Sequence, residues 1–163
     1  MPFLKKDSAD RLVEYLKPED IKEIRKIAPF LSQDTLISLV ERISSAGNLE
    51  MSWLAKIMPF LKTDSADRLV EYLETEDIKD MRKIAPFLRK STIKRLLDRL
   101  DDDDIKFKTL VTVAPFLGGE TLEEILEGMD VKDIGRIEKI APFISRETLK
   151  KWIEGSLKNN RED

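Results

Sequence analysis

A short motif that returns at nearly even spacing is the strongest constraint on how this chain can fold. KIAPFL occurs at residues 26–31 and 83–88, and its variants are MPFL at 1–4 and 58–61, VAPFL at 113–117 and KIAPFI at 139–144. Successive motif prolines are separated by 27, 30, 27, 29 and 27 residues. Periods of about 20–50 residues are typical of repeat arrays, in which each repeat covers the apolar face of its neighbour. The spacing therefore predicts a tandem-repeat protein.

A second, longer period lies over the first. Residues 1–31 match residues 58–88 at 26 of 31 positions, and a more diverged copy begins near Ala114. We expect one helical-repeat domain over residues 1–163, with super-repeats 1–57, 58–113 and 114–163. Close identity between copies is typical of recent duplication, and it also fits laboratory construction.

Each repeat has the pattern of two helices. The first follows the motif and carries apolar residues at i, i+3, i+4 and i+7, as at Leu36, Leu39, Val40 and Ile43. Ser32 or Ser145 is placed to cap such a helix, and Gly118 fits the same position. The second helix opens with acidic or capping residues, and Pro18 suits its first position. Counting both kinds predicts an all-α chain of roughly eleven helices.

The motif itself is predicted to be a turn with an aromatic plug. A proline disfavours helical geometry in the preceding residue and lacks an N–H, so Ala28-Pro29 should end or kink the helix before it. Phe30 and Leu31 then fall in the connection to the next helix, where an aromatic ring can fill the gap between repeats. We therefore expect the motif phenylalanines to be buried.

With two helices per repeat and a motif turn between repeats, the chain resembles the α-solenoid class that includes HEAT, armadillo and tetratricopeptide proteins. The resemblance implies a stack of two-helix repeats that presents an extended binding surface. It concerns architecture alone, because those families use units of about 34 to 47 residues. The tryptophan–glycine–tyrosine pattern of tetratricopeptide units is also absent from this sequence.

Composition removes most catalytic chemistry. The chain has no cysteine and no histidine, which excludes disulfides, thiolate nucleophiles, imidazole bases and the usual zinc ligands. We expect a non-enzyme without cofactor or metal. The net charge of −3 argues against a nucleic-acid partner. The sequence shows neither a signal peptide nor a membrane-spanning run, so a soluble, cytoplasmic protein with no membrane contact is expected.

Three local segments have a structural interpretation and a functional alternative. Asp101 to Asp104 are interpreted as a loop that caps the next helix, with cation binding as the alternative. The basic residues in 89–99 are interpreted as a solvated helix face, with phosphate or nucleic-acid binding as the alternative. Gly118 and Gly119 are interpreted as a cap variant, with anion binding at a helix N-terminus as the alternative.

These observations predict a non-catalytic scaffold that binds another protein, with self-association also considered. The alternative is a structural array or spacer segment of a longer or engineered repeat protein. The candidate interaction face consists of Trp53, Ala55, Thr109 and Val111, which replace charged residues in the same column of neighbouring repeats. Trp53 lies off the apolar stripe of its helix and is expected to be partly exposed; in the alternative interpretation it is buried against an adjacent layer.

Overall fold

The computed structural model describes residues 10–11, 13, 15–16, 24, 26–47, 49–129, 131 and 133–159, and all regular structure within them is helical. The all-α prediction is confirmed for this part of the chain. The first motif, at residues 1–4, and Pro18 lie outside the described residues. The chain divides into two compact units, an N-terminal unit, Met1–Arg89, and a C-terminal unit, Lys90–Asp163. In the described part, no helix is both long and apolar enough to cross a membrane.

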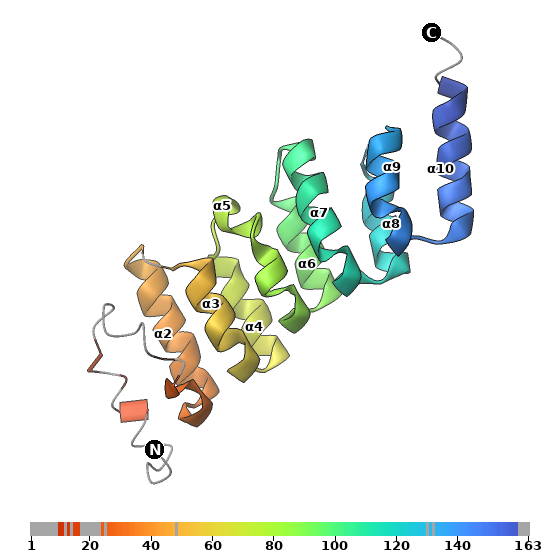
Figure 1. Cartoon of the computed structure of the whole chain (residues 1–163). Helices are drawn as coiled ribbons and strands as arrows, with labels where there is room; N and C mark the ends of the chain where they lie inside the picture. Colours follow the sequence, from red (N-terminus) through yellow and green to blue (C-terminus); the bar gives the residue numbers. More distant parts are fainter. Residues whose placement is uncertain are drawn as a thin grey trace. The chain divides into compact units, whose positions relative to one another are not determined.

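The described part of the N-terminal unit consists of short α-helices separated by 3₁₀ turns. The elements are η2 (Ala28–Phe30), α2 (Gln33–Ser45), α3 (Met51–Ile57), η3 (Met58–Phe60), α4 (Thr63–Leu69), η4 (Val70–Tyr72), α5 (Thr75–Ile78), η5 (Met81–Lys83) and η6 (Ala85–Phe87). The first helices of consecutive repeats, α2 and α4, pack against each other, and α3 packs against η5 (Figure 1).

The predicted apolar stripe of α2 forms part of the core. Leu36, Leu39, Val40 and Ile43 are each at most 4% exposed. The helix begins where expected, because the Ser32 hydroxyl accepts a hydrogen bond from the Thr35 backbone N–H at 3.1 Å. Both the stripe and this cap were predicted correctly from the sequence.

The C-terminal unit has α-helices of 7 to 15 residues. They are α6 (Lys90–Asp98), α7 (Asp103–Leu117), α8 (Gly119–Glu127), α9 (Ile134–Ile140), η7 (Ala141–Phe143) and α10 (Arg146–Asn159). Helix α7 packs against α6, α8 and α9, and α9 packs against α10 (Figure 1). Helix α7 is therefore central to this unit.

The motif forms a 3₁₀ turn in four of the five described copies, and this explains a wrong prediction. Because a 3₁₀ helix has three residues per turn, residues i and i+3 lie on the same side. In the first described motif these are Ala28 and Leu31, which are 1% and 5% exposed. Phe30 lies on another side and is 41% exposed. The motif phenylalanines are thus not the buried plugs that were expected.

The remaining copy differs. Helix α7 runs through Pro115 to Leu117 and ends before Gly118, whose φ of 74° is readily adopted by glycine. The motif proline therefore does not end the helix here, although the sequence predicted that it would end or kink it. In the other described copies the 3₁₀ turn begins one residue before the proline.

Candidate interaction surface

In each described motif three side chains are exposed or half-buried: the proline, the phenylalanine that follows it and the residue three positions before the proline. We call these residues the motif edge. In the N-terminal unit every proline and lysine of the edge is exposed, and Phe60 and Phe87 are half-buried; the set is Lys26, Pro29, Phe30, Lys56, Pro59, Phe60, Lys83, Pro86 and Phe87. In the C-terminal unit the equivalent set is Thr112, Pro115, Phe116, Lys139, Pro142 and Phe143, again with half-buried rings. The motif edge therefore combines two apolar side chains in every described motif with a lysine in four of the five described motifs.

Hydrogen bonds place consecutive motifs side by side in the N-terminal unit. The Gln33 amide, at the start of α2, donates to the Phe60 carbonyl at 2.9 Å and accepts from the Lys62 N–H at 2.8 Å. Gln33, two residues after the motif at 26–31, thus contacts the motif at 56–61 and the residue that follows it. These two motifs of the N-terminal unit therefore lie side by side.

A carboxylate from the preceding repeat holds the residue after the motif in three places. Asp10 accepts from the Ser32 N–H at 2.9 Å, and Asp67 accepts from the Arg89 N–H at 3.1 Å. In the C-terminal unit Glu123 accepts from the Ser145 N–H at 2.8 Å, and this bond, with one from Thr148, lowers the pKa of Glu123. These contacts fix the start of each following helix and with it the motif edge.

The interaction face predicted from the sequence has a different environment from the one expected. Trp53 is 9% exposed and Thr109 is 3% exposed, while Ala55 and Val111 are half-buried. Trp53 and Ala55 belong to α3 and the other two residues to α7, in different units. Trp53 is thus buried, as in the alternative interpretation, and its expected partial exposure is wrong, because α3 is covered outside its stripe of Met51, Leu54 and Ile57 as well.

The acidic run has the capping role that was expected. Asp102 accepts from the Ile105 N–H at 2.8 Å and begins α7. Asp103 and Asp104 bind the Arg136 guanidinium, and the Asp103 bond, at 2.8 Å, is the main reason why the pKa of Arg136 is raised. The same guanidinium lies 5.1 Å from the ring centre of Phe107. Within the described residues, no group of carboxylates is arranged to hold a metal ion.

The basic segment is engaged in ion pairs within the chain. Arg89 pairs with Asp64 and with Asp67, the latter at 3.4 Å, and Lys94 pairs with Glu124. This favours the solvated, ion-paired helix face over a phosphate site. Gly118, before α8, adopts positive φ, and a side chain there would meet the Lys90 ammonium at 3.0 Å. Gly118 and Gly119 are therefore interpreted as a tight connection between α7 and α8.

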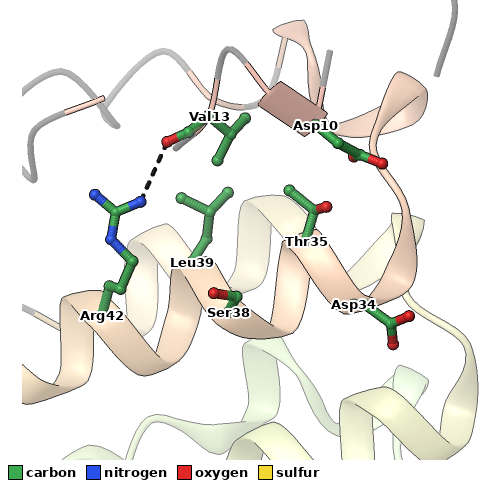
Figure 2. Close-up of a pocket in the computed structure, with 7 residues that line it drawn as sticks. All are labelled: Asp10, Val13, Asp34, Thr35, Ser38, Leu39 and Arg42. Atoms are coloured by element: carbon green, nitrogen blue, oxygen red, sulfur yellow. Dashed lines mark hydrogen bonds between the residues drawn. The ribbon is translucent and has the colours of Figure 1, made fainter. Parts of the chain in front are cut away.

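A cavity of about 240 Å³ lies beside α2 and is lined by Asp10, Val13, Asp34, Thr35, Ser38, Leu39 and Arg42 (Figure 2). Arg42 donates to the Val13 carbonyl at 3.2 Å and to the Leu16 carbonyl at 2.7 Å. Asp10 accepts a hydrogen bond from Ser32 at the start of α2. Asp10 and Arg42, which lie at opposite ends of the cavity, therefore both hold the segment with Asp10, Val13 and Leu16 against α2 (Figure 2).

Sequence reasoning missed the motif edge, although one signal for it was present. A lysine stands three residues before the motif proline in four of the five described repeats, with Thr112 as the exception.

No protein-family model, curated protein or solved structure matches the chain. The site is therefore argued from its own geometry.

Proposed function

We propose that the chain is a non-catalytic protein-interaction scaffold whose binding surface is the motif edge. The single observation that carries this proposal is the position of the motif phenylalanines. Each described motif leaves its ring partly outside the core, next to an exposed proline. Aromatic rings are enriched where proteins bind one another, because they bury a large area with little loss of conformational freedom.

The architecture supports an extended surface. We infer that about eleven helices form one α-solenoid of two-helix repeats. The solenoid is a single domain with super-repeats 1–57, 58–113 and 114–163. In such arrays each repeat contributes the same surface position, so a modest contact per repeat is multiplied along the edge. We also place the protein in the cytoplasm, as a protein without catalytic activity or cofactor.

A selection from a library of random displayed peptides tests this function without knowledge of the natural partner. The bait is the intact chain, and the edge variant carries Phe60→Ala and Phe87→Ala. Tyr72→Ala is the control, because Tyr72 is an exposed aromatic residue, 39%, that lies outside the motif edge at the end of η4. Circular dichroism verifies that all three proteins are folded.

We expect peptides that bind the intact chain and the Tyr72→Ala control but not the edge variant. If the folded edge variant retains every selected peptide, the motif edge is not the binding surface. If the intact chain selects no peptide, the structural array or spacer is the better description.

A further inference from the structure

We propose that the motif edge binds an acidic peptide in an extended conformation, with a carboxylate at every third residue. This rests on the proposed function and assigns the class of partner. The edge of the N-terminal unit places one exposed lysine three residues before each motif proline, at Lys26, Lys56 and Lys83. Lys62, just after the second motif, is also exposed and adds a cation beside Phe60.

The cations of this edge can accept new carboxylates. Lys83 is paired with Asp80 at 3.4 Å, but the two side chains are 52% and 67% exposed. A pair this exposed is largely screened by water and exchanges readily for another anion. Arg89 differs in having a buried partner, Asp67, whose side chain is 10% exposed, and is therefore assigned to the fold, although its pair with Asp64 is at least as exposed as that of Lys83. The proposed contacts are therefore made by Lys56, Lys62 and Lys83.

The period of the edge selects the conformation of the peptide. Packed helices lie about 8–10 Å apart, and α2 packs against α4 in consecutive repeats. A polyproline II segment rises about 3.1 Å per residue with three residues per turn, so every third side chain recurs after about 9 Å on the same side. Such a segment meets Lys56 and Lys83 in successive repeats, with Lys62 as a further cation after the motif at 56–61. The residues between the carboxylates then contact the exposed prolines and half-buried rings.

Two other occupants fit less well. An α-helix repeats its face about every 5.4 Å, or about every 10.8 Å over two turns, which matches a spacing of 8–10 Å less closely than the repeat of about 9 Å of polyproline II. A nucleic acid fits less well because a single lysine per repeat offers few phosphate contacts. Binding of a nucleic acid is one outcome of the test below.

The test uses fluorescence anisotropy with labelled synthetic peptides and the intact chain. The probe is four Glu-Leu-Pro triplets in series. Its controls are a peptide of identical composition in scrambled order, the same triplets with lysine in place of glutamate, and a single-stranded oligonucleotide of equal charge. We expect the probe to bind about tenfold more tightly than the scrambled peptide, and more weakly at high salt.

The protein variants locate the contact. Lys56→Glu with Lys83→Glu should weaken binding of the probe by about tenfold or more, since it replaces two attractions by repulsions. Lys151→Glu, an exposed lysine of α10 outside the edge, should leave binding unchanged. All three positions are exposed, so the variants are expected to fold.

The inference is overturned if the probe and the scrambled peptide bind equally, if the double lysine variant binds as the intact chain does, or if the oligonucleotide binds more tightly than the probe. The peptide selection described above tests the proposed function separately from this inference. If peptide selection yields edge-dependent binders that are not acidic, the scaffold function stands and the acidic partner is wrong.

Discussion

The Asp67 carboxylate accepts a hydrogen bond at 3.1 Å from the backbone N–H of Arg89, which lies 22 residues further along the chain. The same separation joins Asp10 to Ser32 and Glu123 to Ser145. In each case a side chain from the first helix of a super-repeat satisfies an N–H that has no helical partner at the start of a later helix. A polar contact therefore recurs with the repeat, in addition to the apolar core.

Replacing this acceptor gives the first prediction. Asp67 is 8% exposed, so Asp67→Ala leaves the Arg89 N–H without its acceptor and removes an ion pair. We expect a loss of about 1–3 kcal/mol in the free energy of unfolding. Asp67→Asn keeps an acceptor oxygen and should lose less. Urea denaturation measures both, and equal losses would show that the hydrogen bond is not what stabilises this position.

The acidic limb of the stability profile gives a second prediction. The N–H of Ser145 stabilises the ionised form of Glu123 and lowers its pKa. A lowered pKa in the folded state means that the stabilisation is complete above the ordinary glutamate pKa and is lost as the pH falls through the folded value. Glu123→Gln keeps an acceptor but does not titrate. The difference in Tm between the intact chain and Glu123→Gln should therefore shrink as the solution is acidified, and a difference that is constant with pH would contradict this.

The helical core was predictable from periodicity, whereas the exposure of the motif was not. Leu36, Leu39 and Val40 are buried because a 3.6-residue period places them on one face, which sequence alone reveals. The fate of Phe30 depends on whether the motif forms an α or a 3₁₀ turn, a difference of one hydrogen-bond register that the motif residues do not decide. Pro115, in a continuous α-helix, shows that the same residues permit both.

The candidate site could be predicted in part. The lysine column is visible in the sequence, since Lys56 and Lys83 occupy the same motif position, but the exposure of these lysines and the partial exposure of the motif rings required the structure. The sequence left two interpretations of Trp53 open, because an amphipathic stripe alone does not define the whole buried side of a helix. A helix as short as α3, packed against more than one neighbour, buries residues outside its stripe as well.

The turn geometry leads to a third prediction, which revises the expectation for Phe87. Ile84 is 0% exposed, so Ile84→Ala should destabilise by about 2–5 kcal/mol. Phe87 is half-buried, and Phe87→Ala should cost about 1–2 kcal/mol, below the cost of a fully buried ring. Chemical denaturation of the two variants under the same conditions compares them. A larger loss for Phe87→Ala would mean that the ring is a core plug after all.

The Arg136 cluster gives a fourth prediction. Its guanidinium binds Asp103 and Asp104 and faces Phe107, while 19% of the side chain is exposed. Arg136→Lys keeps the charge but loses the planar fork that binds two carboxylates and stacks on the ring. We expect a loss of about 1–2 kcal/mol for Arg136→Lys in urea denaturation at low salt. A variant as stable as the intact chain would show that charge alone is sufficient at this position.

A fifth prediction compares one repeat position in two helices of the C-terminal unit. Leu97 of α6 and Ile153 of α10 each lie eight residues after the residue that follows the motif, so the two positions are equivalent. Leu97 is nevertheless 0% exposed, whereas Ile153 is 41% exposed. Because the transfer of apolar area and the cavity left behind both scale with burial, Leu97→Ala should cost about 2–5 kcal/mol and Ile153→Ala less than about 1 kcal/mol. Denaturation of each variant across a range of protein concentrations measures both costs. Equal costs, or a cost for Ile153→Ala that grows with protein concentration, would show that Ile153 is covered when the protein is in solution.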